Sequence, residues 1–191
     1  MKIIGIITRK SISKENHDID YSYSNIVKMI YECGAIPIGI FLNKNYKKTI
    51  DICDGIIFQG GDNFQKYDLE TLLYCYEKDI PTFGICLGMQ LMGFAFDGEL
   101  IDIKNHKDTY HEIYVNKDSK LYNIFNKEKI KVNSRHKSVL KSTNLKITSK
   151  SIEGYIESIE DSSKKFFIGV QWHPEDINQK EIFQKLIDSC Y

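Results

Sequence analysis

The residue pattern with the clearest chemical potential is Gly84-Ile85-Cys86-Leu87-Gly88, in which a cysteine stands between two glycines. A short apolar stretch precedes the cysteine and a helical pattern follows it, so the motif falls where a strand turns into a helix. Such a turn projects its central side chain, and the helix N-terminus stabilises a thiolate and offers free amides to an oxyanion. The alternative interpretation is an ordinary buried thiol in a chance pattern of small residues.

A second pattern could supply the base that a cysteine nucleophile needs. The stretch Phe166 to Trp172 is strongly strand-like and delivers His173-Pro174-Glu175 at its end. Proline restricts the geometry between its two neighbours, so the carboxylate can hold the imidazole in one tautomer. Taken alone, this sequence would be a surface turn. Together with Cys86 it supplies a nucleophile, a base and an orienting group at one edge of a sheet.

The remaining histidines and cysteines carry weaker signals. His17, His106, His111 and His136 show no comparable carboxylate partner, and His106 and His111 are interpreted as solvated residues of a polar loop. The five cysteines are odd in number and lack CxxC spacing, which argues against a disulfide framework and a zinc site. We therefore expect neither a metal ion nor a cofactor.

Length and charge narrow the class of protein further. The 191 residues, 42% of them hydrophobic, suffice for one core, so residues 1–191 are expected to form a single domain. Twenty-six basic side chains balance 26 acidic ones, which gives no field to attract nucleic acid or a membrane surface. The apolar run Ile3 to Ile7 is too short for a signal peptide or a membrane span, so we expect a cytoplasmic protein with a small-molecule substrate.

The elements that must position these residues alternate in the first half of the chain, which favours a parallel sheet covered on both faces. In such sheets, sites form beyond the carboxyl ends of the strands, where both Cys86 and the Gly60-Gly61 turn would lie. The predicted strands are Lys2–Thr8, Ala35–Leu42, Asp54–Phe58 and Thr82–Ile85, and the predicted helices are Tyr23–Cys33, Tyr46–Cys53, Leu69–Lys78 and Cys86–Phe96.

The second half is richer in strands and closes with a helix. The segment Tyr155–Glu160 alternates polar and apolar side chains, as a half-exposed strand would. The predicted strands are Glu99–Ile103, His111–Val115, Lys129–Asn133, Leu145–Ser149, Tyr155–Glu160 and Phe166–Trp172, followed by the helix Asn178–Ser189.

Two short sequences together resemble the paired signatures of class I glutamine amidotransferase domains. They are Gly84-Ile85-Cys86-Leu87-Gly88-Met89-Gln90 and Gln171-Trp172-His173-Pro174-Glu175. Within that class the chain resembles the γ-glutamyl hydrolase branch, peptidase C26, which includes the γ-glutamyl-γ-aminobutyrate hydrolases, and the likeness covers essentially the whole chain. The segments that carry this likeness are Tyr21–Pro37, Asp54–Asp62, Val132–His136 and Glu153–Glu160.

The resemblance implies a fold and a reaction. The implied fold is α/β and flavodoxin-like, with a mostly parallel central sheet, helices on both faces and additional antiparallel strands in the second half. The implied triad is Cys86, His173 and Glu175, which would cleave a γ-glutamyl amide bond through a γ-glutamyl thioester and need no metal.

The resemblance also implies how a substrate would be held. The oxyanion hole would use the backbone amides of Leu87 and of the glycine turn, with Gly61 favoured over Gly60. Gln90 stands four residues after Cys86, one helical turn along the same face, where it would meet the glutamyl part. Further substrate contacts are expected from Ser134, Arg135 and His136.

Three departures from the branch leave the leaving group of the substrate open. Leu87 stands where this branch usually carries arginine, and leucine there is typical of amidotransferase subunits. Arg135-His136-Lys137-Ser138 replaces an aromatic residue followed by His-His-Gln, so this side of the pocket would be basic. The chain is also shorter than typical members, which would reduce the loops around the leaving group.

Three functions remain after this reasoning. The first is a hydrolase that releases glutamate from a γ-glutamyl amine, a γ-glutamyl peptide or an activated glutamine derivative. The second is a glutaminase subunit that passes ammonia to a synthase partner. The third belongs to another class: a non-catalytic binding module on the same scaffold, because a fold alone never proves a function.

Overall fold

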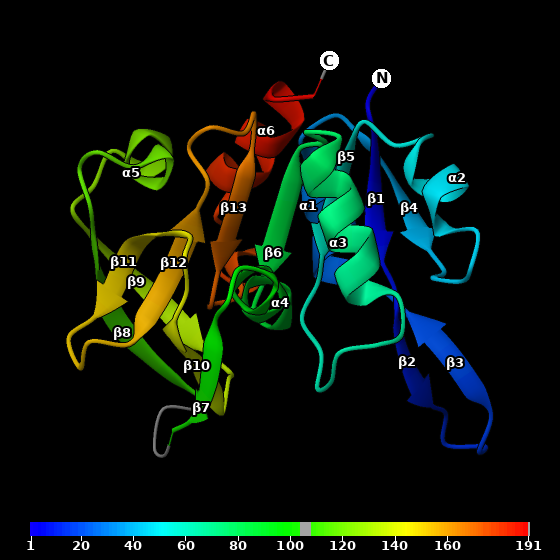
Figure 1. Cartoon of the computed structure of the whole chain (residues 1–191), viewed down its shortest axis with the longest axis horizontal. Helices are drawn as coiled ribbons and strands as arrows, with labels where there is room; N and C mark the ends of the chain where they lie inside the picture. Colours follow the sequence, from blue (N-terminus) through cyan, green and yellow to red (C-terminus); the bar gives the residue numbers. More distant parts are fainter. Residues whose placement is uncertain (104–107, 191) are drawn as a thin grey trace.

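The computed structural model describes residues 1–103 and 108–190, which are built around a nine-stranded sheet (Figure 1). From one edge of the sheet to the other, the strands are β4 (Ile36–Ile40), β1 (Ile3–Ile7), β5 (Gly55–Phe58), β6 (Thr82–Ile85), β13 (Phe167–Val170), β12 (Ile156–Glu160), β11 (Lys146–Ser151), β8 (Thr109–Val115) and β9 (Lys129–Ser134).

The sheet has a parallel half and an antiparallel half that meet at β13. The strands β4, β1, β5, β6 and β13 run parallel, whereas each pair from β13 to β9 is antiparallel. Ile85 at the end of β6 is paired with Val170 at the end of β13. The residues that follow these two strands therefore emerge side by side, at the edge where sites form in open α/β sheets.

Helices cover both faces of the sheet, as the alternating pattern predicts. Each face carries its own cluster of buried apolar residues, and no helix within the described residues is long and apolar enough to span a membrane. One face is covered by α1 (Ser24–Glu32), α5 (Lys120–Phe125) and α6 (Lys180–Asp188), and the other by α2 (Tyr46–Ile50), α3 (Asp68–Glu77) and α4 (Leu87–Ala95).

Every strand and helix predicted from the sequence has a counterpart, and the structure adds elements that were not predicted. The hairpin of β2 (Arg9–Ile12) and β3 (Asp18–Tyr21) extends beyond the sheet, and β10 (Ser138–Ser142) is paired with β7 (Glu99–Asp102) (Figure 1). The helix α5 is the third addition. These short elements are mostly polar or only a few residues long, so they lack a clear apolar period.

The prediction of a half-exposed strand at 155–160 is wrong, because β12 lies inside the sheet between β13 and β11. All five residues of β12 are buried, including Glu157 and Glu160. The alternation in this segment reflects buried polar groups that have partners. A buried carboxylate is tolerated only where hydrogen bonds or opposite charges replace its water.

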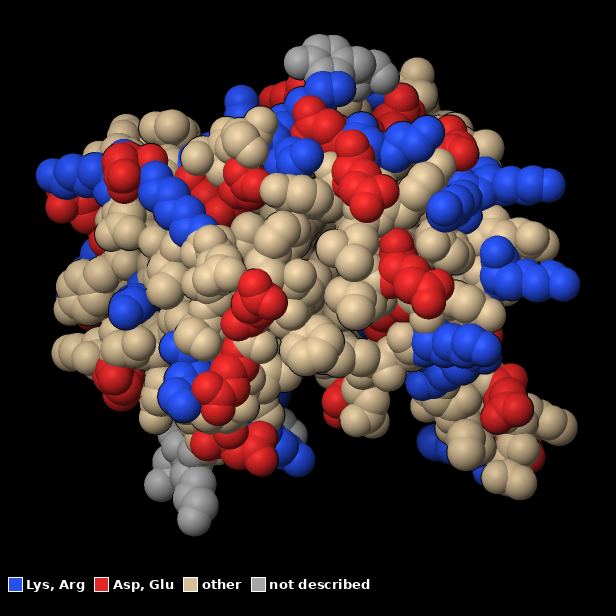
Figure 2. Space-filling model, in the orientation of Figure 1, with Lys and Arg blue, Asp and Glu red and all other residues tan. Residues whose placement is uncertain are grey.

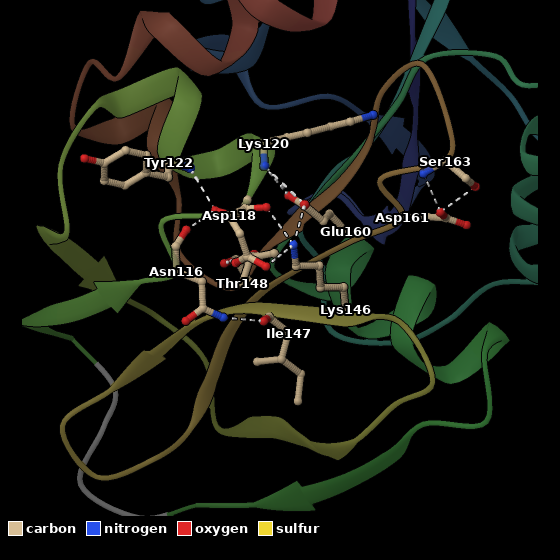
Figure 3. Close-up of polar contacts among 12 residues, drawn as sticks. Asn116, Asp118, Lys120, Tyr122, Lys146, Ile147, Thr148, Glu160, Asp161 and Ser163 are labelled. Carbon is tan, nitrogen blue, oxygen red and sulfur yellow. Dashed lines mark hydrogen bonds and ion pairs between the residues drawn. The ribbon is translucent and has the colours of Figure 1, made fainter.

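Glu160 has such partners at the start of α5 (Figure 3). Its two carboxylate oxygens accept hydrogen bonds from the backbone N–H of Lys120 at 3.1 and 2.9 Å, and the ammonium of Lys146 lies 3.9 Å from Oε1. Lys146 also binds Asp118, so the three charged groups tie β11, β12 and the approach to α5 together. One carboxylate thus anchors α5 to the antiparallel half.

Replacing Glu160 by alanine should lower the free energy of unfolding by about 1–3 kcal/mol, because the amide and the ammonium lose their acceptor. Glu160→Gln should cost less, since it keeps one acceptor and removes a buried charge.

Burial raises the pKa of Glu160 above 4.5, so the free energy of unfolding of the wild type, relative to that of Glu160→Gln, should fall as pH rises from about 4.5. Urea unfolding at several pH values measures both effects, and an alanine variant as stable as wild type would contradict the anchor.

Candidate active site

Cys86 occupies a strained turn between β6 and α4. Its φ of 53° and ψ of −104° are unusual for a residue with a side chain, and its N–H donates to the carbonyl of Val170 at 2.8 Å. The flanking glycines allow close packing: a Cβ at Gly88 would lie 2.0 Å from the carbonyl oxygen of Phe58, and one at Gly84 would lie 2.5 Å from a methionine sulfur. The motif therefore forms the predicted elbow, with Cys86 just before the first turn of α4.

His173 and Glu175 come from the segment that follows β13. The Nδ1 atom of His173 lies 2.7 Å from Oε1 of Glu175, and both side chains are buried. Asn133, at the end of β9, accepts from the backbone N–H of His173 at 2.8 Å and donates to its carbonyl at 3.0 Å. The imidazole is therefore fixed at its backbone by Asn133 and at one ring nitrogen by Glu175.

The electrostatics of this group favour a protonated imidazole. Burial by itself lowers the pKa of His173, but the hydrogen bonds and charges of Cys86 and Glu175 raise that pKa overall, from 6.5 to about 10. A cysteine and a carboxylate therefore face the same ring from its two sides. This arrangement can hold a thiolate beside an imidazolium, which is the reactive form of a cysteine nucleophile.

The glycine turn after β5 closes this edge. A Cβ at Gly60 would lie 2.9 Å from Cε1 of His173 and 3.7 Å from Cβ of Cys86, so Gly60 leaves the room that the imidazole occupies. Gly61 lies against the side chain of Leu87, and both residues line a cavity of about 290 Å³ that Cys86 also borders. The first amides of α4 have no acceptor within the helix. Gly61 is thus better placed than Gly60 to face a bound carbonyl.

The cavity opens at the carboxyl ends of the parallel strands. Figure 2 shows a notch in the lower edge of the molecule, between the β2–β3 hairpin and the region of β7 and β10. On the face that the figure shows, basic and acidic side chains are interspersed, in keeping with the balanced charge. The lining residues are Gly61, Asp62, Cys86, Leu87, Gln90, Arg135, His136, Lys137 and Ser138.

Two glutamines connect the nucleophilic sulfur to the wall of this cavity. The amide nitrogen of Gln171 lies 3.6 Å from Sγ of Cys86, and its oxygen accepts from Nε2 of Gln90 at 3.2 Å. The same nitrogen of Gln90 donates to the carbonyl of Ser138 at 2.8 Å. Gln90 therefore lies where the resemblance placed it, one turn beyond Cys86 and at the cavity.

The expected substrate contacts divide into two groups. Arg135 and His136 line the cavity, and Nη1 of Arg135 also forms an ion pair with Asp176 at 2.8 Å. Ser134 is buried at the end of β9 and is not among the lining residues. Among the predicted site residues, the structure thus brings all but Ser134 to the triad, the glycine turn or the cavity.

Sequence reasoning missed several residues that shape the site. Gln171 contacts the sulfur, Asn133 holds His173, and the ring of Tyr23 meets the imidazole edge-on with centroids 6.4 Å apart. The position of Gln171, two residues before His173 in the same strand-end motif, was the available signal. Asn133 and Tyr23 lie in segments that carry the family likeness, but their contacts with His173 could not be predicted, because they join segments far apart in the sequence.

The interpretation of His111 as a solvated loop residue without a carboxylate partner is wrong. It lies on β8, mostly buried, with Nε2 3.1 Å from Oε1 of Glu157. His106 lies outside the described residues. Within the described part of the chain, the metal-ligand atoms of His173, Glu175 and Asp176 come within 4.8 Å of one another, but the first two bind each other and Asp176 binds Arg135.

Comparisons with known proteins agree with this fold. The chain is 29% identical to the GMP synthase [glutamine-hydrolyzing] of Dictyostelium discoideum over 94% of its length, although it spans only 25% of that enzyme. It is 28% identical to a glutamine amidotransferase-like protein of Rickettsia prowazekii, with 83% of each chain covered. Its fold matches the glutaminase domain of Trypanosoma brucei CTPS with bound acivicin, with a TM-score of 0.77, 15% identity and coverage of 99% and 93% of the two chains.

The fold and these relatives define a class I glutamine amidotransferase-like protein, in which the mixed sheet carries a cysteine elbow. Residues 2–175 match the family Peptidase C26, and the chain belongs to that family. The family is of the cysteine-dependent glutamine amidotransferase and peptidase C26 type, which supports a hydrolase.

Replacing Gly60 by alanine should displace the imidazole, because the new Cβ would overlap Cε1 of a ring that Glu175 holds in place. We expect alkylation of Cys86 by iodoacetamide at neutral pH to slow by roughly tenfold or more, since the thiolate loses the adjacent imidazolium. Gly39→Ala is the matched control, because its Cβ would only touch a methyl group of Thr8 at 3.3 Å. Equal alkylation rates in the two variants would contradict this geometry.

Glu175→Gln should lower the pKa of His173 from about 10, because the largest fixed negative charge beside the ring is removed. The raised value means that the stability contributed by His173 is fully present below about pH 6.5 and is lost as pH rises towards 10. NMR titration of the labelled imidazole should show no change in wild type from about pH 6 to pH 8. A wild-type ring that titrates near its ordinary value would refute the assignment.

Proposed function

We propose that the protein hydrolyses a γ-glutamyl amide bond and releases glutamate through a thioester on Cys86. One observation carries this proposal: Cys86 in its strained elbow, Gly61 of the glycine turn and His173, which is bound to the buried Glu175, line one pocket. Membership of the peptidase C26 family supports the same bond. Cys86 as the nucleophile, His173 as the base and Glu175 as the group that orients the base are the three parts that covalent amide hydrolysis needs.

The proposed reaction begins with attack of the Cys86 thiolate on the γ-carbonyl carbon. The negative charge moves to the carbonyl oxygen, where the backbone amides of Leu87 and Gly61 would bind it. The imidazolium of His173 gives its proton to the leaving nitrogen, the C–N bond breaks and a γ-glutamyl thioester remains. His173 then takes a proton from water, the hydroxide attacks the thioester, and collapse releases glutamate and restores the thiolate.

The lining of the cavity supports a leaving group that carries negative charge. Arg135 and Lys137 both border the cavity, while Asp62 is the acidic residue of the same wall. Asp176 neutralises part of the charge of Arg135, whereas Lys137 is an exposed cation at the edge of the cavity. An activated glutamine derivative with an anionic amine portion would suit these cations.

The second candidate function is a glutaminase subunit that delivers ammonia to a synthase partner. It is favoured by the likeness to GMP synthase, of which the chain spans 25%, and by Leu87, whose side chain packs against Gly61. Such a subunit would use the same chemistry at Cys86. It would differ from a stand-alone hydrolase in being nearly silent without its partner.

The test is glutamate release by the purified chain from glutamine and a panel of neutral and anionic γ-glutamyl amides. We expect the anionic members to be cleaved fastest, and Cys86→Ala to reduce turnover by roughly 10³-fold or more. Lys137→Ala should weaken kcat/KM for the anionic members by roughly tenfold and leave the neutral ones unchanged. Lys141→Ala, which removes an exposed cation paired with Glu99, is the matched control.

Two outcomes would overturn parts of the proposal. Residual turnover in Cys86→Ala near the wild-type rate would exclude the thioester. Silence towards the whole panel, with Cys86 still readily alkylated, would favour the glutaminase subunit, and an unreactive Cys86 would favour a binding module.

A further inference from the structure

A buried ion pair lies directly behind the glycine turn. Arg9 follows β1 and Asp68 begins α3, and their side chains are only 2% and 1% exposed. Nη1 of Arg9 donates to Oδ2 of Asp68 at 2.6 Å. Neither residue lines the cavity that Cys86 borders. A charged pair in such a position needs an explanation, because burying two ions is unfavourable unless their partners compensate.

Arg9 and Asp68 together hold both ends of the loop that carries Gly60 and Gly61. At the start of the loop, Nη2 of Arg9 donates to the carbonyl of Gln59 at 3.2 Å. At its end, Oδ2 of Asp68 accepts from the backbone N–H of Gln65 at 2.8 Å. Since Nη1 of Arg9 binds the same carboxylate oxygen, one guanidinium joins the two ends.

The centre of the loop rests on the same arginine. A Cβ added at Gly61 would meet Cδ and Cγ of Arg9 at 3.2 and 3.3 Å, and Cδ2 of Leu87 at 3.2 Å. Gly61 is therefore held between the stem of Arg9 and the start of α4. A shift of that stem would leave Gly61 without one of its two supports.

The side chain of Gln59 completes the support from the other direction. Its amide nitrogen donates to the carbonyls of Ile7 and Tyr21 at 3.0 and 2.9 Å, and its oxygen accepts from the N–H of Tyr23 at 2.9 Å. Gln59 is fully buried. These contacts fix the loop relative to β1 and the β2–β3 hairpin, while Arg9 fixes it relative to α3.

The pair is poorly suited to a purely stabilising role. Nε of Arg9 and Oδ1 of Asp68 are buried and have no hydrogen-bond partner among residues 1–103 and 108–190. A buried pair stabilises a fold only when its remaining donors and acceptors are satisfied, and otherwise its attested use is to specify one geometry. Here the geometry specified is that of the loop opposite Cys86.

We infer that Arg9 and Asp68 are positioning residues, which hold the Gly61 amide where the oxyanion of the reaction forms. This inference rests on the proposed γ-glutamyl hydrolysis. Arg9 and Asp68 touch neither the substrate nor the nucleophile. Their effect is on the transition state, because the loop amide meets the carbonyl oxygen most strongly when that oxygen is charged.

The discriminating variant is the double substitution Arg9→Met with Asp68→Leu, which replaces both charges by apolar side chains of similar size and leaves no unpaired ion in the core. We expect kcat to fall by about 10- to 10³-fold, the upper limit being the loss of one oxyanion donor, with KM within about threefold of wild type. Alkylation of Cys86 by iodoacetamide should stay at the wild-type rate, because Cys86, His173 and Glu175 are not displaced.

The affinity for a γ-glutamyl aldehyde is a second measurement, which would not change if Arg9 and Asp68 only stabilised the fold. Its carbonyl accepts the thiolate of Cys86 and forms a thiohemiacetal whose oxygen occupies the oxyanion site. Aldehyde affinity should fall by the same factor as kcat/KM in the double variant. Binding of an intact γ-glutamyl amide, measured in a Cys86→Ala background, should not change.

Two further variants serve as controls. Arg9→Lys keeps the charge in the core but loses the fork that reaches both Asp68 and Gln59, so it should show an intermediate loss of kcat and keeps the test decisive if the double variant fails to fold. Glu160→Gln removes another buried carboxylate, far from the loop, and should leave kcat unchanged.

The inference is overturned if a folded double variant, or Arg9→Lys in its place, keeps wild-type kcat and aldehyde affinity, or if only KM rises. A wild-type protein that cleaves no γ-glutamyl amide would instead contradict the proposed function. In that case hydrogen exchange of the Gly61 amide still tests the placement of the loop. Faster exchange in the variant supports the inference, and unchanged exchange refutes it.

Discussion

The parallel pairing of β6 with β13 is the constraint on which the site depends. Because Ile85 and Val170 end their strands in register, the chain delivers Cys86 and the segment leading to His173 to the same edge of the sheet. The N–H of Cys86 itself bonds to Val170 and continues that register into the turn. A slip of one residue would turn every side chain of a strand to the opposite face and would separate the two groups.

The charge on His173 depends on this proximity of Cys86, His173 and Glu175, all of which are buried. Burial opposes charge on His173, yet Cys86 and Glu175 act on the ring from both sides and outweigh that cost. Gly60 contributes by having no side chain, since a methyl group there would overlap the ring. Charge, burial and the shape of the backbone therefore act on one imidazole, and none of the three alone would hold it.

Much of this could be predicted from the sequence, because the informative signals are local. Periodicity and the placement of glycines predict the strand before Cys86, the helix after it and the strand before His173. The contacts of Asn133 with His173 and of Arg9 with Asp68 have no local signature, since they join segments that only the finished fold brings together. The alternation of 155–160 misled for the same reason, because the buried state of Glu160 depends on α5.

Asn133 links the catalytic histidine to the outermost strand of the antiparallel half. β9 is the last strand at the far edge of the sheet, yet Asn133 at its end makes both backbone hydrogen bonds to His173. The antiparallel half must therefore twist round until its outermost strand reaches the residues after β13. The geometry of the triad therefore depends on the antiparallel half of the sheet as well as on the parallel strands that deliver Cys86 and His173.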